Sequence, residues 1–208
     1  MKYSDYFSRR KNTFEKTYSL ILNNIDRKKT FNIVELGSTR SFVSWRVEND
    51  EKYWTPDNIE NWPWSDGLFT KVFADNLEGF NFKLYTIDPC PKANKVVKTI
   101  IGNNQNVEII SGYSTDFLNN IDFKIDLLYM DHMESSKEAC ETHLIDSKLI
   151  IEKDLMAKNS IILIDDTPPG SNFHSKGLLS IPYIIDNGYT KVMHEYQALF
   201  SKNSSIII

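Results

Sequence analysis

Two short apolar runs that end in acidic residues constrain this chain more than any other feature. Ile125–Met130 runs into Asp131, and Ile161–Ile164 runs into Asp165 and Asp166. Each run is short and apolar enough to be a β-strand buried on both faces. Acidic side chains at the carboxyl ends of parallel strands project into the crevice where open α/β sheets bind ligands. We therefore expect the two strand ends to form one site.

The site expected at these strand ends holds three carboxylates and, directly after Asp131, the imidazole of His132. Oxygen ligands suit a hard cation, and carboxylates beside a histidine also suit acid–base chemistry. Each acid taken alone could instead cap a helix or a turn. Their occurrence at the ends of two neighbouring central strands favours a functional site.

Composition and charge limit the class of protein. The chain has 208 residues, 41% of them apolar, which suits one domain with a substantial core. A net charge of −4 argues against a nucleic-acid binder that works by neutralising phosphates. No run is long enough to span a membrane, the first residues do not resemble a signal peptide, and only two cysteines are present. These features predict a cytoplasmic protein that acts on a small molecule, and they are compatible with a homo-oligomer.

Apolar periodicity predicts helices that alternate with strands. Residues 1–28 form an N-terminal helical segment, in which Ser4–Asn24 carries one apolar stripe with Arg9 and Arg10 away from it. The predicted strands are Phe31–Leu36, Phe82–Ile87, Val107–Ile110, Ile125–Met130, Ser160–Ile164 and one or two within Thr190–Phe200. The predicted helices are Gly67–Leu77, Lys92–Ile101, Ser114–Asn120, Ser135–Met156 and Lys176–Asp186. This order predicts an α/β fold with a Rossmann-like, doubly wound, mostly parallel seven-stranded sheet and helices on both faces.

An insertion at residues 44–67 interrupts this alternation within the single domain, residues 1–208. It is polar and rich in turn formers, and it holds all four tryptophans, Trp45, Trp54, Trp62 and Trp64. Dense aromatics argue against disorder. The insertion could be a hydrophobic cluster over the sheet edge, an oligomer contact, or one wall of a substrate pocket. We favour the pocket wall, because the insertion closely follows the turn after the first strand.

The turn after the first strand contains one glycine, Gly37, so the G-x-G-x-x-G dinucleotide fingerprint is absent. This weakens a nicotinamide or flavin assignment. Asp88 ends the second strand, where an acid bonds the hydroxyls of a nucleoside ribose. The alternative for Asp88-Pro89 is a turn that starts a helix. The ribose role is favoured, because it also fits Gly37 on the adjacent strand.

Five motifs follow one another at consecutive strand ends: Glu35-Leu36-Gly37, Asp88, Gly112-Tyr113-Ser114 with Asp116, Tyr129-Met130-Asp131-His132 and Ile164-Asp165-Asp166. In this order they resemble the motifs of class I S-adenosylmethionine-dependent methyltransferases, and within them the catechol O-methyltransferase-like group. The resemblance extends from Phe31 to Phe200, with the tryptophan-rich insertion as an addition. It implies S-adenosylmethionine as the cofactor.

The resemblance also implies which residues hold the cofactor. Asp88 would bind the ribose, and Gly112, Tyr113 and Ser114 would border the adenine. The implied cofactor-binding residues are Glu35, Gly37, Ser38, Ser41, Asp88, Gly112, Tyr113, Ser114, Asp131 and His132.

The same resemblance implies that Asp131, Asp165 and Asp166 bind a divalent cation, usually magnesium. Such an ion lowers the pKa of a chelated hydroxyl, whose oxygen then attacks the sulfonium methyl group in line. The acceptor would be a small diol, sugar or phenol with neighbouring oxygens that can chelate the ion. The implied catalytic residues are Asp131, His132 and Glu134.

Two departures from the group's pattern leave the general base open. Glu134 stands where the mammalian-type enzymes have a lysine base, so Glu134, His132 or metal activation alone could serve. Ser38 and Ser41 follow Gly37 where a second glycine is usual. Arg40 could meet the cofactor's carboxylate or form a surface ion pair.

Two rival functions keep the same sheet. One is a metal-dependent hydrolase or oxygenase, although a two-histidine oxygenase site needs a second histidine beside the acids. The other is a catalytically silent methyltransferase-fold protein that acts in assembly, which the missing lysine base would allow.

Overall fold

A computed structural model describes residues 1–39, 59, 62, 64–170 and 175–202, and it contains a seven-stranded sheet in the order β3-β2-β1-β4-β5-β7-β6. The strands are β1 (Phe31–Leu36), β2 (Phe82–Asp88), β3 (Val107–Ser111), β4 (Ile125–Met130), β5 (Met156–Ile164), β6 (Thr190–His194) and β7 (Ala198–Ser201). Neighbouring strands are parallel, except that β7 runs antiparallel to both β5 and β6. The predicted Rossmann-like fold is confirmed.

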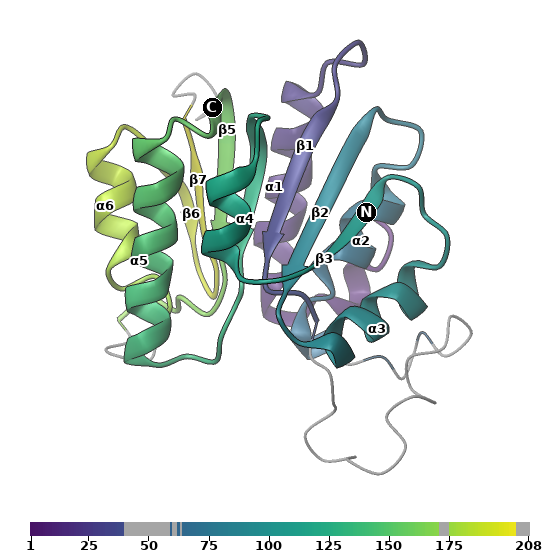
Figure 1. The fold of residues 1–208 in the computed structure, drawn as a ribbon, viewed down its shortest axis with the longest axis horizontal. Helices are drawn as coiled ribbons and strands as arrows, with labels where there is room; N and C mark the ends of the chain where they lie inside the picture. The colour runs from purple at the N-terminus through teal and green to yellow at the C-terminus, as the bar shows by residue number, and fades with distance from the viewer. Residues whose placement is uncertain (40–58, 60–61, 63, 171–174, 203–208) are drawn as a thin grey trace.

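Helices cover both faces of the sheet. They are α1 (Lys11–Asn24), α2 (Phe69–Asn76), α3 (Pro91–Ile101), α4 (Ser114–Asn120), α5 (Lys137–Glu152) and α6 (Ser180–Asp186). Figure 1 shows α4 and α5 in front of the sheet and α1 and α2 behind it. None of the helices within these ranges is long and apolar enough to cross a bilayer.

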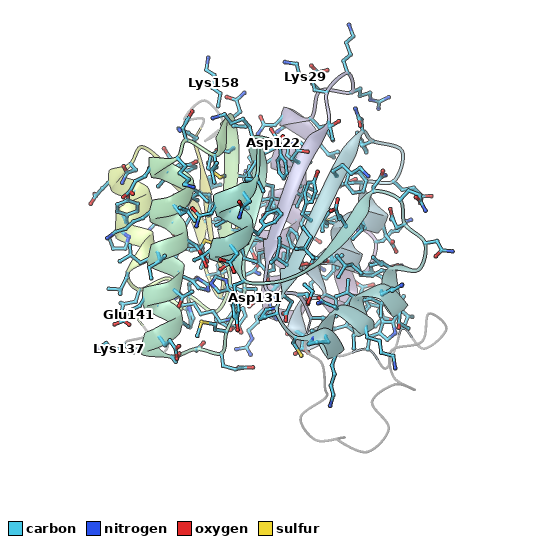
Figure 2. The ribbon with its side chains drawn as sticks, in the orientation of Figure 1. Lys29, Asp122, Asp131, Lys137, Glu141 and Lys158 are labelled. Carbon is cyan, nitrogen blue, oxygen red and sulfur yellow. The ribbon has the colours of Figure 1, made fainter. Side chains whose placement is uncertain are left out.

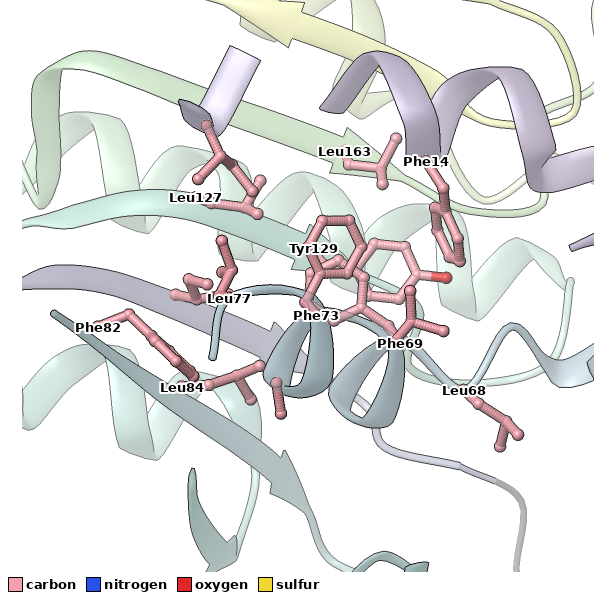
Figure 3. Packing of buried hydrophobic residues seen from close by; sticks show 14 of the residues in the cluster. Phe14, Leu68, Phe69, Phe73, Leu77, Phe82, Leu84, Leu127, Tyr129 and Leu163 are labelled. Atoms are coloured by element: carbon pink, nitrogen blue, oxygen red, sulfur yellow. The ribbon is translucent and has the colours of Figure 1, made fainter. Parts of the chain in front are cut away.

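Alternation along the strands divides the core into two layers. In β4, Leu127 and Tyr129 face the layer that contains α1 and α2, whereas Leu128 and Met130 face the layer of α4, α5 and α6. Both layers are apolar because a parallel sheet is covered on both sides. Figure 3 shows the ring of Tyr129 among aromatic side chains of the first layer, where it stacks on Phe69 with ring centroids 4.2 Å apart.

Several predicted boundaries are wrong, including the start of β5, which lies at Met156 rather than Ser160. The N-terminal segment starts with two 3₁₀ turns, Ser4–Tyr6 and Ser8–Arg10, before α1 begins at Lys11. Helix α5 ends at Glu152 rather than Met156, because Asp154 adopts a positive φ of 50° and Met156 already pairs with Ile125 in the sheet.

The last helix also starts later than predicted, at Ser180 rather than Lys176. Pro182 therefore lies in the first turn of α6, where its missing N–H breaks no helical hydrogen bond. Lys176 therefore lies in the loop between β5 and α6 rather than in the helix. This loop places Lys176 at the site described below.

The strand order reverses between β1 and β4, which lie at the centre of the sheet. Open α/β sheets bind ligands at such a reversal, because the following loops diverge there and leave a crevice. The backbone N–H of Asp131, after β4, donates to the carbonyl oxygen of Leu36 in β1 at 2.9 Å. The crevice therefore opens beside Gly37 and Asp131.

Candidate functional site

A polar cavity of about 330 Å³ opens at this reversal of strand order. The residues of the sequence prediction that line it are Gly37, Ser38, Asp88, Asp131, His132, Glu134 and Asp166. Arg9, Arg10, Lys176 and Tyr196 also line it, and the sequence prediction did not include them. Figure 2 shows Asp131 towards the lower edge of the sheet.

Gly37 brings the loop after β1 into close contact with the loop after β4. Its φ is +82°, and a Cβ built on it would lie 2.4 Å from the Cα of His132 and 2.5 Å from its backbone nitrogen. Only glycine avoids both the left-handed strain and this backbone clash. The close approach leaves the cavity floor as bare backbone, which a cofactor can approach.

Asp88 presents a fixed carboxylate to the cavity. Its Oδ2 accepts from the backbone N–H of Ser38 at 3.1 Å, and its Oδ1 accepts from the backbone N–H of Cys90 at 2.7 Å. Each oxygen has a second lone pair for another donor. The carboxylate is thus preorganised to accept from a pair of neighbouring hydroxyls, as the ribose prediction requires.

His132 is held by two buried polar residues of α5. Its ring stacks on that of His143 at a centroid distance of 4.2 Å, and its Nε2 lies 3.1 Å from Oδ2 of Asp146. Both α5 residues, His143 and Asp146, are fully buried. Burial lowers the pKa of His143 well below its usual value. A neutral His143 therefore supports the ring of His132 at the cavity wall.

The three acids predicted from the strand ends do come together. One carboxylate oxygen from each of Asp131, Asp165 and Asp166 lies within 4.8 Å of the others. Tyr129 lies beneath them, with its hydroxyl 3.1 Å from Asp131 Oδ2 and 3.0 Å from Asp165 Oδ2. The convergence follows from the parallel pairing of β4 with β5, in which Met130 lies opposite Ile164.

Two cations from distant parts of the chain enter this cluster. The guanidinium of Arg10 forms a fork on Asp165, with Nη2 at 2.7 Å and Nε at 2.9 Å from Oδ2. The ammonium of Lys176 lies 2.7 Å from Asp131 Oδ1 and 2.9 Å from Asp166 Oδ2. Only 5% of the Arg10 side chain and 3% of the Lys176 side chain are exposed.

Burial and charge act in opposite directions on the pKa values of the cluster. Burial and the charge of Asp165 raise the pKa of Asp131 well above its usual value. The charges of Lys176 and Arg10 oppose this shift but do not cancel it. Burial lowers the pKa of Lys176, but the charges of Asp131 and Asp166 outweigh it, so the net shift is upward. Lys176 therefore stays an ammonium across the physiological pH range.

These contacts decide whether the cluster fits a divalent cation. All six carboxylate oxygens face a donor of the protein: those of Asp165 face Arg10, and those of the other two acids face Lys176, Tyr129 or Tyr196. A metal ion needs free lone pairs and a strongly negative site, whereas here two cations offset two of the three carboxylate charges. The number and placement of the acids suit magnesium, but the surrounding donors do not. The metal role of Asp131, Asp165 and Asp166 stays a prediction, and these donors oppose it.

Glu35 lies behind the cavity, where it lines a smaller pocket and accepts a hydrogen bond from the hydroxyl of Thr70 in α2. Its side chain is buried and does not line the main cavity. Burial raises the pKa of Glu35 to about 7, although the hydrogen bond from Thr70 opposes the shift. Glu35 therefore contacts α2 rather than the main cavity, and its role in cofactor binding stays a prediction.

The raised pKa of Glu35 predicts a pH-dependent stability. The unfolded chain binds fewer protons than the folded one between the ordinary pKa of 4.5 and the folded value of about 7. The free energy of unfolding therefore falls across that window, by about 3 kcal/mol in total. We expect Glu35→Gln to remove this fall and to exceed the wild type in stability at about pH 8 but not at about pH 5. Urea denaturation at both pH values measures this, and an equal difference at both would contradict it.

The other predicted cofactor residues lie outside the cavity or outside the described ranges. Gly112, Tyr113 and Ser114 follow β3, and Tyr113 is 65% exposed. Within the part of the chain that the structure describes, none of these three lines the main cavity. Ser41 and Arg40 fall in residues 40–58, which the structure does not describe.

Two of the four tryptophans do not form a pocket wall. Trp62 and Trp64 are buried in the first core layer, and Trp64 stacks on Tyr6 with ring centroids 4.8 Å apart. The predicted substrate contact is wrong for these two, and Trp64 instead packs against Tyr3 and Tyr6 of the N-terminal segment. Trp45 and Trp54 lie outside the described residues.

The residues that the sequence prediction missed share one property: their partners are far away in the chain. The sequence predicted that Arg10 lies away from the apolar stripe of the N-terminal helix. It predicted that Lys176 starts another helix. Tyr196 stands before β7, where its hydroxyl donates to Asp166. No local pattern marks such residues, although a lone basic residue close to the Pro168-Pro169-Gly170 break was a usable signal.

Comparison with known proteins agrees with this geometry. The family profile described as "Methyltransferase domain" matches residues 65–167, from just before α2 to just after Asp166. No curated protein matches the chain significantly.

Several solved structures share the fold at low sequence identity. The N-methyltransferase NodS from Bradyrhizobium japonicum has a TM-score of 0.55 and 12% identity over 94% of this chain and 96% of NodS. SMU.1697c of Streptococcus mutans, a candidate methyltransferase in complex with S-adenosylhomocysteine, has a TM-score of 0.54 and 12% identity over 91% of this chain and 97% of its own. The O-methyltransferase segment of StiE has a TM-score of 0.52 and 12% identity over 89% of this chain and 55% of its own.

These neighbours include both N- and O-methyltransferases, so the shared fold leaves the acceptor atom open and does not single out the catechol O-methyltransferase-like group. The domain match and the seven-stranded sheet agree on the broader class. The chain is therefore a methyltransferase with the fold of the class I, S-adenosylmethionine-dependent enzymes.

Proposed function

We propose that this protein transfers a methyl group from S-adenosylmethionine to a hydroxyl of a small polar acceptor, such as a diol, sugar or phenol. The carboxylate of Asp88 carries this proposal: two backbone N–H groups fix it at the cavity, directly beside the loop of Gly37. Such a carboxylate accepts hydrogen bonds from the two hydroxyls of a ribose. Bound there, the cofactor supplies an electrophilic methyl group on its sulfonium.

The other side of the cavity supports a polar acceptor. Arg9 lies over the ring of Tyr196, with its guanidinium carbon 4.0 Å from the ring centroid, and Glu134 and Asp166 lie on the same lining. Charged and hydroxyl-bearing side chains of this kind select hydroxylated molecules over apolar ones, because an apolar molecule would leave them desolvated and unpaired.

The chain itself offers two groups that could take the acceptor's proton. Glu134 is exposed at the cavity mouth, and His132 lies on the cavity wall with its Nε2 3.1 Å from Asp146 Oδ2. A general base must come within hydrogen-bond reach of the hydroxyl, either directly or through one water. Replacement of each residue in turn, followed by the pH dependence of turnover, would distinguish them.

We expect Asp88→Ala to weaken binding of both S-adenosylmethionine and S-adenosylhomocysteine by about 10- to 100-fold, because two charge-assisted hydrogen bonds to the ribose are lost. Isothermal titration calorimetry measures both affinities. Asp122→Ala is the matched control, because Asp122 lies at the opposite end of the sheet (Figure 2). Unchanged affinity in Asp88→Ala, or no binding of either ligand to the wild type, would overturn the proposed cofactor site.

A panel of diols, sugars and phenols then tests the acceptor class. Transfer of a labelled methyl group to an oxygen of one of them is the expected result. Transfer only to amine acceptors would show that the acceptor atom is wrong while leaving the cofactor site intact.

A further inference from the structure

Lys176 lies between two of the three acids to which the sequence prediction assigned a metal ion. Its Nζ lies 2.7 Å from Asp131 Oδ1, 2.9 Å from Asp166 Oδ2 and 3.2 Å from the backbone oxygen of Asp131. An ammonium has three N–H donors, so these three acceptors use all of them. The cation thereby joins the acid at the end of β4 to the acid at the end of β5.

The third acid, Asp165, pairs with the second cation, Arg10. Arg10 reaches both oxygens of Asp165, with Nε 3.2 Å from Oδ1 and Nη2 2.7 Å from Oδ2. A planar fork on a carboxylate is the strongest geometry available to an arginine. Together, Arg10 and Lys176 leave at most one uncompensated negative charge on the three acids.

Entry of a divalent cation into this cluster would be costly. The side chain of Lys176 is 3% exposed and that of Arg10 is 5% exposed, so both charges would stay close to the ion or have to be expelled. Two buried positive charges within a few ångströms repel a dication strongly, because little water screens them. Expulsion of Lys176 would also break all three of its hydrogen bonds.

We propose that Lys176 replaces the divalent cation at this site: its ammonium neutralises and positions Asp131 and Asp166, and methyl transfer proceeds without a metal ion. Lys176 is a positioning residue, since its donors are all used by the protein. The acceptor's proton then passes to a group of the chain or to water, with no metal-bound oxygen involved. Only the catalytic part of this inference rests on the proposed function, whereas the absence of a metal site can be tested without any substrate.

The direct test is titration of the purified full chain with Mn²⁺, followed by electron paramagnetic resonance and calorimetry. We expect no saturable site in the wild type at micromolar Mn²⁺. Lys176→Ala removes the ammonium and opens space between the acids, so we expect it to bind Mn²⁺ at least about tenfold more tightly than the wild type. Lys176→Arg keeps the positive charge and should not gain the site.

Lys137→Ala is the matched control, because Lys137 is a solvent-exposed lysine that lies 3.7 Å from Glu141. It should behave as the wild type does. A merely structural role for Lys176 predicts instability in Lys176→Ala but no gain in metal affinity, so the titration separates the two roles.

Two results would overturn the proposal. One is micromolar binding of Mn²⁺ to the wild type that Asp166→Asn abolishes. The other is a folded Lys176→Ala protein, as judged by circular dichroism, that binds Mn²⁺ no better than the wild type. If Lys176→Ala does not fold, the wild-type titration still decides, because a saturable site that Asp166→Asn abolishes contradicts the proposal and the absence of such a site supports it.

The catalytic part is tested by treating the wild type with EDTA during turnover. An unchanged rate supports metal-independent transfer, and a rate that falls with EDTA and returns with Mg²⁺ overturns it. If no acceptor is methylated at all, the proposed function fails, but the Mn²⁺ titrations still give their own answer. The two failures are therefore distinguishable.

Discussion

Arg10→Met is expected to lower the free energy of unfolding by about 3–5 kcal/mol, because it leaves Asp165 as a fully buried and uncompensated carboxylate. The methionine keeps much of the apolar stem of Arg10, so the loss comes mainly from charge. In a chain of this size such a loss corresponds to a fall of about 10 °C or more in melting temperature. Urea denaturation and differential scanning calorimetry measure both quantities.

The neighbouring arginine provides the control for this prediction. Arg9 is exposed and contacts the ring of Tyr196, so Arg9→Met should cost no more than about 1 kcal/mol. The double variant Arg10→Met/Asp165→Asn should recover part of the lost stability, because it removes the stranded charge. Similar losses for Arg9→Met and Arg10→Met would show that the fork on Asp165 contributes little.

Gly37→Ala is expected to lower stability by about 2–5 kcal/mol and to remove measurable binding of S-adenosylmethionine. An alanine Cβ at this position would lie 2.4 Å from the Cα of His132, and the φ of +82° is strained for any residue with a Cβ. The clash is with backbone, which cannot move aside as a side chain can. The loops after β1 and β4 must therefore separate, and both line the cavity.

Gly79 offers a control with the same backbone strain but no clash. Its φ is +87°, and a Cβ there would meet no atom within 4 Å. Gly79→Ala should therefore cost about 1–2 kcal/mol and leave cofactor affinity unchanged. Calorimetry on both variants checks this. Cofactor affinity in Gly37→Ala equal to that in Gly79→Ala would mean that the close approach to His132 is unnecessary for binding.

The boundaries of the elements were only partly predictable, and the misses share a cause. The prediction extended α5 through Met156, because the apolar spacing of the helix continues into the apolar residues of β5. Pairing of Met156 with Ile125 assigns that residue to the sheet, and this pairing joins residues 31 positions apart. Periodicity within one segment does not report on such a partner.

The sequence by itself determined the sheet, its helices and the convergence of Asp131, Asp165 and Asp166. These follow from local apolar patterns and from a general rule, because parallel strands always carry their following residues to the same edge. Only the tertiary structure decided what meets those acids. Arg10 is 155 positions from Asp165 and Lys176 is 45 positions from Asp131, and a charge pair across such distances leaves no periodic pattern in the chain. An ion pair forms wherever folding brings two charges together, so the choice between a metal site and a site neutralised by the chain's own cations appears only in three dimensions.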